Sequence, residues 1–429
     1  MILKHLSLAR VRAFEQADFD FQPGMNLLVG VNGAGKSTIL DVLRSTLSYA
    51  LPQFTASRSR PIAFTEDDIT VGQNALTIEL DFEAAGIPFE HLIHFPRKDF
   101  VVDESKEGQV RHQTIELVER NELSIRNNIN LASLKQQKEQ PLVLFFSTRR
   151  ATYNRAQPTK QRSAGDQAAA YADALAPRGL YIREFAEWWL ARQTLAKEKK
   201  ELGQILDFLN LAVTELLENC SNLRAERHSD ASLVVDKNGV KLDVSQLSDG
   251  ERGLLVLALD LGLRLSQANP ELEDPLQAGK AVVLIDELDL HLHPQWQRTI
   301  VDKLTDTFRN CQFICTTHSP LIIGETQPSN LYLLTQIDNQ IQVKRKAYSY
   351  GLDANWILEH LMKTPVRPET VQTQITRVED ALENGELNKA REELATLREM
   401  MHSDVNEVVR LEASINTLEA LADEMDSEE

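Results

Sequence analysis

The sequence predicts an α/β fold with a buried parallel sheet, and three observations predict it. Met25–Val29 is a short apolar run that leads into a glycine-rich segment and then into a helical pattern beginning within 35–38. Val282–Ile285 and Phe313–Cys315 are uninterrupted apolar runs, as expected of parallel strands covered on both faces. Beyond Pro365 only helical patterns remain. We therefore expect an α/β core followed by an α-helical C-terminal extension.

The composition is that of an ordinary globular protein. The chain has 429 residues, of which 42% are hydrophobic and 26% charged. No apolar run approaches the roughly 18 residues that a membrane helix needs. Three cysteines are too few for a disulfide framework, and residues 1–6 lack the pattern of a secretion signal. These features predict a cytoplasmic protein with no membrane contact.

The negative charge is concentrated near the C-terminus. The whole chain carries −18, and residues 366–429 alone carry −11, from six Lys/Arg and seventeen Asp/Glu. Such a segment repels nucleic-acid phosphates. A basic partner protein, or solubility alone, suits it better than DNA binding.

The strongest motif is Gly30–Ser37, which reads G-x-x-x-x-G-K-S after an apolar strand and at the start of a helix. Glycines there let backbone N–H groups surround phosphates at a helix N-terminus. Lys36 would reach the β- and γ-phosphates, and the Ser37 hydroxyl would hold Mg²⁺. A glycine-rich turn with a chance lysine is the alternative. The motif predicts a P-loop NTPase that uses ATP and Mg²⁺. The expected nucleotide-binding residues here are Gly30, Asn32, Gly33, Ala34, Gly35, Lys36, Ser37 and Thr38.

Two acids, Asp286 and Glu287, follow the apolar run Val282–Ile285. A buried strand that ends in adjacent carboxylates typically opens into a polar cleft. We expect Asp286 to hold Mg²⁺ and Glu287 to orient or activate the attacking water. A strand ending in acids is common by itself, and the signal gains its force from the P-loop motif.

The segment Leu247–Glu251 reads Leu-Ser-Asp-Gly-Glu, just before the Asp286–Glu287 strand. In form and order it resembles the signature motif of ABC-type ATPases. The resemblance implies that Ser248, Gly250 and Glu251 contact the γ-phosphate held by a second subunit. A plainer interpretation is that Ser248 caps a helix and Glu251 closes a capping box. That description also fits, but it does not account for the order of the motifs.

Three further positions match the same family. Asp289 lies where the family carries its D-loop, and the resemblance implies a contact with the partner subunit. His318 follows the next buried strand, as the switch histidine does, and would sense or stabilise the γ-phosphate. Arg12 matches an early arginine that the SMC/RecF-like branch directs towards nucleotide, with Arg10 as a competing candidate.

One family element is missing. ABC ATPases place a glutamine at the end of a strand that leads into the helical lobe. The best positional match here, Ser147–Arg150, contains no glutamine, and Gln140 precedes its strand. His291, His293 and the cysteines at 311 and 315 are better explained as D-loop and strand residues than as a transition-metal site.

These motifs suggest a division of the chain. We expect residues 1–105 and 231–348 to form the nucleotide-binding lobe, 106–230 to form an inserted, largely helical lobe, and 349–429 to form an acidic helical region that binds a partner. The stretch 147–165 carries five basic residues and no acidic one. It is either a solvated loop or a nucleic-acid contact, and the arginines considered for such a contact are Arg149, Arg150 and Arg155.

The whole pattern resembles the compact ATPases of the bacterial Septu and retron anti-phage defence systems. The resemblance includes 26–41, 145–150, 246–252, 284–296 and 316–320, and it extends to 350–358 and the acidic helical hairpins that follow. It implies an ABC ATPase head with a helical insertion, a homodimer or higher oligomer joined through head-to-tail ATP sites, and a separate HNH-type nuclease as partner. The alternatives are a RecF-like DNA-repair ATPase that binds DNA directly, or an ATP-dependent scaffold.

Overall fold

The computed structural model describes most of the chain: residues 1–97, 119–125, 131–150, 167–177, 179–198, 203–227, 229–337, 340–345, 348–401 and 406–427. The chain divides into two compact units, Met1–Ile357 and Leu358–Glu429. We refer to the first as the head and to the second as the helical unit. No described helix combines the length and apolar character needed to cross a membrane.

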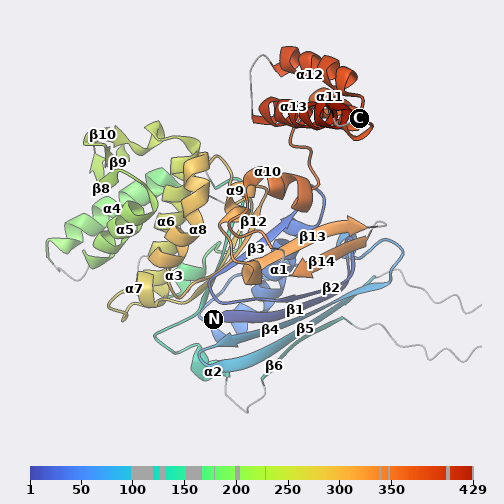
Figure 1. The fold of residues 1–429 in the computed structure, drawn as a ribbon. Helices are drawn as coiled ribbons and strands as arrows, with labels where there is room; N and C mark the ends of the chain where they lie inside the picture. The colour runs from blue at the N-terminus through green and yellow to red at the C-terminus, as the bar shows by residue number, and fades with distance from the viewer. Residues whose placement is uncertain are drawn as a thin grey trace, which may run out of the picture. The chain divides into compact units, whose positions relative to one another are not determined.

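The head is built around a six-stranded sheet in the order β14-β13-β3-β12-β11-β7. Figure 1 labels β14, β13, β3 and β12 of this sheet. Its pairings are parallel except for β13 with β14. The members are β3 (Met25–Gly30), β7 (Leu142–Phe146), β11 (Ala281–Ile285), β12 (Gln312–Thr317), β13 (Leu331–Ile337) and β14 (Gln340–Arg345). Every residue of β3, β7, β11 and β12 is buried, which explains why they read as continuous apolar runs. The predicted α/β class is confirmed.

A second sheet of five antiparallel strands has the order β2-β1-β4-β5-β6. Its strands are β1 (Ile2–Val11), β2 (Phe14–Asp20), β4 (Ala75–Ala84), β5 (Ile87–Pro96) and β6 (Arg120–Ile125). Helix α1 (Lys36–Phe54) contacts β3, β11 and β12 of the first sheet and β5 of the second, so it lies between the two sheets. The main hydrophobic core joins residues from both sheets and from α1.

Most of the remaining helices of the head gather beside the six-stranded sheet, whereas α2 lies near the five-stranded sheet (Figure 1). Helix α5 packs on α6 and α8, α8 on α9, and α6 contacts β7. A small antiparallel sheet, β10-β9-β8, packs against α4 and α5. Its strands are β8 (Cys220–Arg227), β9 (Ala231–Lys237) and β10 (Val240–Asp243), and the helices are α2 (Leu131–Leu134), α3 (Ala168–Tyr171), α4 (Ile182–Ala196), α5 (Gln204–Leu216), α6 (Asp249–Ala268), α7 (Pro275–Ala278), α8 (Pro294–Thr307), α9 (Pro320–Gly324) and α10 (Ala354–Trp356).

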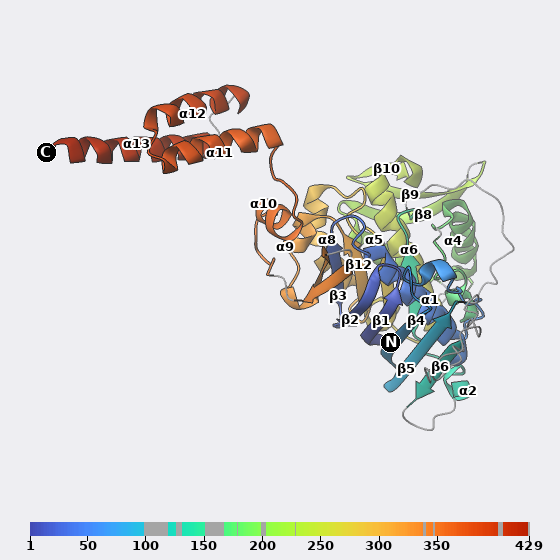
Figure 2. The same ribbon diagram turned by 90° about the vertical axis from the view of Figure 1, so that its right-hand side faces the viewer.

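The helical unit consists of α11 (Glu369–Glu383), α12 (Leu387–Met401) and α13 (Asn406–Ser427), which lie side by side (Figure 2). Its core is aliphatic, without an aromatic ring among the described members. Residues with the 3- and 4-residue spacing of an amphipathic helix supply it, among them Ile375, Val378, Leu394 and Leu397.

Several strands were not predicted from the sequence. Strands β6, β8, β13 and β14 were missed, and β13 and β14 complete the main sheet. Within the expected insertion 106–230, β6 pairs with β5 and β7 pairs with β11, so both strands join sheets formed by the flanking segments. The exact lobe boundaries remain a prediction.

Candidate nucleotide-binding and hydrolysis site

The P-loop connects β3 to α1, and its glycines are required by close packing. A Cβ atom on Gly30 would lie 2.4 Å from the carbonyl oxygen of Leu334. Gly35 has φ +82°, and a Cβ there would lie 2.6 Å from the Phe14 ring. A side chain at either position would therefore displace the neighbouring strand or hairpin. Because the chain turns tightly here, α1 begins at Lys36 with its N-terminus facing the loop.

Lys36 folds back over its own loop. Its Nζ donates to the carbonyl oxygens of Gly30, at 2.8 Å, and Val31, at 3.0 Å. Burial lowers the pKa of Lys36 to about 8, against the opposing effect of the carboxylates of Asp286, Glu287 and Asp289. The ammonium group is therefore held inside the loop. There, an anion would replace the two carbonyl oxygens as the acceptor of its hydrogen bonds.

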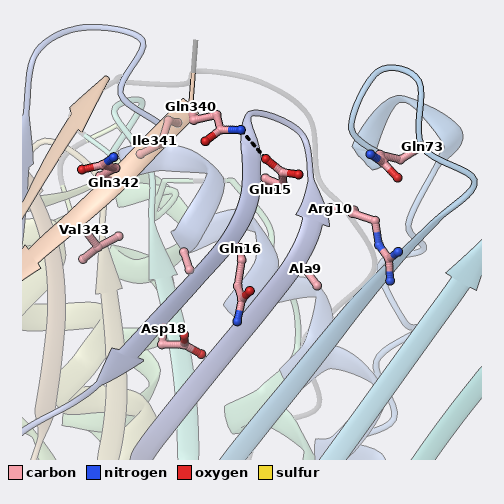
Figure 3. A pocket seen from close by; sticks show the side chains of 11 residues that line it. Ala9, Arg10, Glu15, Gln16, Asp18, Gln73, Gln340, Ile341, Gln342 and Val343 are labelled. Carbon is pink, nitrogen blue, oxygen red and sulfur yellow. Dashed lines mark hydrogen bonds between the residues drawn. The ribbon is translucent and has the colours of Figure 1, made fainter. Parts of the chain in front are cut away.

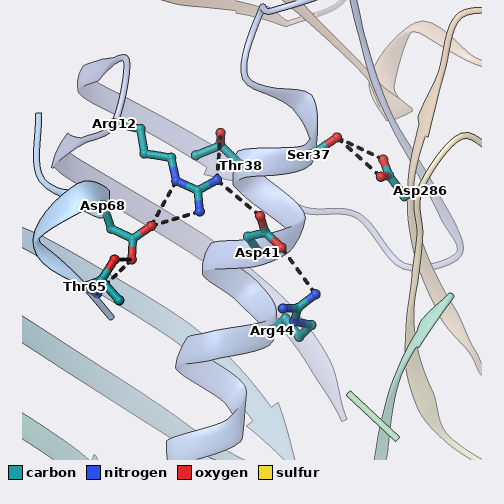
Figure 4. A network of polar contacts seen from close by, with 8 residues as sticks. All are labelled: Arg12, Ser37, Thr38, Asp41, Arg44, Thr65, Asp68 and Asp286. Atoms are coloured by element: carbon teal, nitrogen blue, oxygen red, sulfur yellow. Dashed lines mark hydrogen bonds and ion pairs between the residues drawn. The ribbon is translucent and has the colours of Figure 1, made fainter. Parts of the chain in front are cut away.

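Ser37 and Asp286 bring the P-loop and β11 together. The Ser37 hydroxyl donates to the Asp286 carboxylate, with oxygen–oxygen distances of 3.1 and 3.4 Å (Figure 4). A hydroxyl and a carboxylate oxygen so close together are the hard oxygen donors that Mg²⁺ prefers. The residues present fit a magnesium ion, which would neutralise phosphate charge. Thr316 helps to fix the same carboxylate, since its hydroxyl donates to Asp286 Oδ1 at 2.7 Å.

Glu287 is the second residue after β11 and has an unusual backbone conformation. Its φ is +50°, in the left-handed region that residues other than glycine rarely adopt. Its N–H donates to Thr316 Oγ1 at 2.7 Å, and its carbonyl accepts from Arg150 Nη2 at 2.6 Å. The side chain is half-buried, and the carboxylate influences the pKa of both Lys36 and His318, which places it within the same polar site.

Asp289 and His318 meet at the end of β12. The Asp289 carboxylate accepts from Thr317 Oγ1, at 2.6 Å, and from the His318 N–H, at 3.2 Å. Burial, followed by the charge of Lys36, lowers the pKa of His318 despite the nearby carboxylates. The imidazole is therefore neutral at pH 7 and offers one donor and one acceptor.

The Leu247–Glu251 turn lies at the N-terminus of α6, and Ser248 is its N-cap. Ser248 Oγ accepts from the Glu251 N–H at 3.3 Å, and the Ser248 N–H donates to Glu251 Oε2 at 2.9 Å, so the capping box is present. Glu251 also pairs with Lys237 at 2.5 Å and is almost fully buried. A Cβ on Gly250 would lie 2.3 Å from the His291 carbonyl oxygen, so this turn lies against the segment that contains Asp289. Ser248 itself is exposed.

Arg12 joins the P-loop helix through a network of charges (Figure 4). Its Nη1 lies 3.5 Å from Thr38 Oγ1 and 3.2 Å from Asp41, while Nε and Nη2 each lie 2.9 Å from Asp68. Burial opposes the charge of Arg12, but the hydrogen bonds that it donates to Asp68 and Asp41, and the charges of these carboxylates, raise its pKa overall. Arg12 is thus placed beside the first turn of α1, as the family resemblance implies.

Arg10, the competing candidate, points elsewhere. It lines a separate polar pocket of about 790 Å³ between the β1–β2 hairpin and β14 (Figure 3). Glu15, Asp18 and Gln340 lie around the same space, and Gln340 donates to Glu15. Between the two arginines, only Arg12 has contacts with the P-loop helix.

The predicted nucleic-acid contact through Arg150 is wrong. Its side chain is buried, with 5% of the residue exposed, and donates to the carbonyl oxygens of Asp286 and Glu287. A group held inside the head cannot bind an external phosphate chain. Arg149 is exposed, and Arg155 lies outside the described residues together with most of the basic stretch 147–165.

Several residues that shape the site were not predicted from the sequence. Thr316, Thr317 and Arg150 hold the three acids, and their only sequence signal is a position next to a predicted strand end. Gln140 lies at the opposite, amino end of β7, where its amide oxygen accepts from the Ala56 N–H and the Tyr171 hydroxyl. It is a structural residue remote from the carboxyl ends of the strands.

Three relatives are similar to this protein along most of the chain. "Retron Ec83 probable ATPase" from Escherichia coli is 28% identical over 85% of this chain and 76% of the relative. "Retron Vc95 probable ATPase" from Vibrio cholerae is 25% identical over 90% and 84% of the two chains. "Septu protein PtuA" from Bacillus thuringiensis is 22% identical over 94% of both chains.

Among solved structures, the SMC head domain from Thermotoga maritima is 16% identical and has a TM-score of 0.45, covering 80% of this chain and 99% of that one. A family model matches residues 25–324, which include the P-loop, the α6 turn, both acids and His318. The chain belongs to this family, AAA_21, whose description reads "AAA domain, putative AbiEii toxin, Type IV TA system".

Proposed function

We propose that this protein is a magnesium-dependent ATPase that works as the regulatory subunit of an anti-phage defence complex and controls a separate HNH-type nuclease. The ATPase activity is supported by one observation: Lys36 and Ser37 of the P-loop lie in one polar site with Asp286 and Glu287, the two residues that follow β11. The loop and helix N-terminus bind the triphosphate. Ser37 and Asp286 would hold a magnesium ion, whose chemistry there would be to neutralise charge on the phosphates. Glu287 orients and deprotonates the attacking water, and neutral His318 donates to the γ-phosphate.

Each site is completed by a second copy of the chain. Ser248 is exposed at the N-terminus of α6, where the first N–H groups of a helix have no intrahelical acceptor. Such a helix end favours an anion. The γ-phosphate held by one protomer would be bound by Ser248 and Gly250 of its twin, with Asp289 at the contact. Both sites would form at the same interface between two heads. ATP binding would therefore join the heads, and hydrolysis would separate them.

The defence role is supported by the names of the relatives, two called retron ATPases and one called Septu protein PtuA. The helical unit suits partner binding because its basic side chains are largely paired within it. Arg367, Arg391, Arg398 and Arg410 each contact a glutamate of the unit, which leaves an acidic surface for a basic partner. We expect an HNH nuclease encoded beside this gene to co-purify with the full chain and not with residues 1–357.

Shared sites are tested by mixing two defective proteins. Ser248→Arg blocks the turn, and Lys36→Ala disables the P-loop, so each protein alone should not hydrolyse ATP. A mixed dimer retains at most one intact composite site and should recover part of the wild-type rate. Full activity of Ser248→Arg alone would refute the sharing of sites.

The hydrolytic role of Glu287 is tested separately. Glu287→Gln should bind ATP and remain dimeric in light scattering, because the water is no longer activated while Lys36 and Ser37 are intact. Normal hydrolysis by this variant would remove Glu287 from the mechanism. We expect wild-type turnover at or below about 1 s⁻¹, the low end of ordinary enzymes.

A further inference from the structure

The peptide of Glu287 is held from both ends by side chains distant in sequence. Its N–H donates to Thr316 at the end of β12, and its carbonyl accepts from Arg150, which follows β7. The preceding carbonyl, of Asp286, accepts from Arg150 Nη1 at 2.7 Å. One guanidinium therefore binds two successive carbonyls at the carboxyl end of β11.

The shape of the side chain suits this position. Arginine presents several N–H donors in a fixed planar fork, so two of its nitrogens can serve two adjacent acceptors. Lysine, with a single nitrogen on a flexible stem, cannot reproduce that geometry. Burial lowers the pKa of Arg150, but guanidinium remains charged in proteins, and the carboxylates of Asp286, Glu287 and Asp289 lie near enough to favour its charge.

The backbone that Arg150 binds has an inherent tendency to relax. Glu287 has φ +50°, which is unfavourable for a residue with a Cβ and persists only where the surroundings impose it. If the carbonyl lost its donors, rotation towards negative φ would redirect the Glu287 side chain. A carboxylate that must align a water molecule loses most of its effect when displaced by about 1 Å.

We propose that Arg150 is a positioning residue for ATP hydrolysis, which fixes the Asp286–Glu287 turn so that the Glu287 carboxylate faces the attacking water. This inference rests on the proposed role of Glu287. Arg150 does not touch nucleotide in this account; it acts through Glu287. It stands where the related ABC ATPases place a glutamine, at the strand end that leads into the helical lobe.

Arg150→Met and Arg150→Lys separate binding from hydrolysis. Lys36 and Ser37 are untouched, so ATP affinity should stay within about threefold of wild type, while the single-turnover rate falls about 10- to 100-fold. Arg150→Lys keeps the charge and should recover only part of the rate. Should Arg150→Met fail to fold, the lysine variant alone decides, and a wild-type rate from either folded variant overturns the proposal.

Arg264→Met is the matched control. Arg264 is also buried and also donates to two backbone carbonyls, those of Ala170 and Ala172, at 2.7 and 2.9 Å. Its loss should lower the melting temperature while the rate per folded molecule stays near wild type. A purely structural role for Arg150 would give the same result, with a lower melting temperature and an unchanged rate.

The decisive comparison is a double mutant. If Arg150 works through Glu287, adding Arg150→Met to Glu287→Gln should not lower the residual single-turnover rate further. An equal fold-loss in both backgrounds would show that Arg150 acts independently and overturn the inference. If Glu287→Gln alone hydrolyses normally, the proposed role of Glu287 fails and this inference fails with it; if Glu287→Gln is inactive and Arg150→Met is not, only this inference fails.

Discussion

Charged side chains are used differently in the two units of the chain. In the head, Arg150, Arg264 and Glu251 are buried and bind backbone groups or a single partner. In the helical unit several ion pairs lie at the surface, as for Arg391 with Glu419 and Arg398 with Glu412. A buried ion or polar group is costly to leave unpaired, whereas an exposed pair contributes little. The head therefore combines its hydrophobic core with buried charges that fix local geometry, whereas the helical unit relies on its aliphatic core.

Among these substitutions, Asp286→Asn should have the largest effect, because it removes a charge on which the site in the head depends. The amide keeps the volume but loses the charge that holds magnesium beside Ser37. We expect the hydrolysis rate to fall by at least about 100-fold, the scale for loss of one electrostatic group at a reacting centre. Steady-state phosphate release at several magnesium concentrations measures it, and a rate restored by excess magnesium would indicate weakened binding of the ion.

Leu397→Ala tests the core of the helical unit. Leu397 is fully buried among aliphatic side chains of α11, α12 and α13. Its truncation should destabilise the unit by about 2–5 kcal/mol. Amide hydrogen exchange in the full chain should show faster exchange across 369–427, while the ATPase rate of the head stays unchanged. Faster exchange in α1 or α6 as well would mean that the two units do not unfold independently.

Glu251→Gln tests a buried charge of the head. Burial alone would raise the pKa of Glu251, but the hydrogen bonds from Lys237 and from the N–H and hydroxyl of Ser248 lower it below its ordinary value. Since the folded pKa lies below the unfolded one, the stabilisation is fully present above the unfolded value, near pH 4.5, and is lost as the pH falls through the folded pKa. At pH 7 the substitution should cost about 1.5–3 kcal/mol.

Chemical unfolding at pH 7 and at successively lower pH checks this sign. The difference between wild type and Glu251→Gln should shrink as the pH falls below 4.5. A difference that stays constant would assign the effect to packing instead of charge.

Arg391→Gln should have the smallest effect. Arg391 and Glu419 lie at the surface, where solvent screens an ion pair, so the free energy of unfolding should change by far less than in Glu251→Gln. The effect should vanish in about 1 M salt, where charges are screened within about 3 Å. A loss as large as that of Glu251→Gln, or one insensitive to salt, would contradict the contrast between the two units.

Local sequence patterns were sufficient to predict the centre of the head. The run Met25–Val29 with its glycines, and the run Val282–Ile285 with its acids, each contain both the strand and the residues at its end. Physical periodicity and turn chemistry are local properties, and they located the P-loop, the acids and the α6 turn correctly in the fold.

Long-range pairing could not be read in the same way. Strands β13 and β14 were missed although Leu331–Leu334 is buried, because a short apolar run does not distinguish a strand from a buried helix. Arg150 lies in a stretch of five basic residues, and nothing in that stretch marks the one that contacts residues 136 and 137 positions away. Its role follows from tertiary contacts alone.

The capping box of α6 affects how the monomer binds anions at Ser248. The Ser248 hydroxyl is already engaged by Glu251, which Lys237 holds in place. Any incoming oxygen anion must compete with an internal carboxylate that never dissociates from the molecule. In a monomer the Glu251 carboxylate thus occupies the Ser248 hydroxyl, and weakly binding anions such as chloride or free phosphate should displace it poorly.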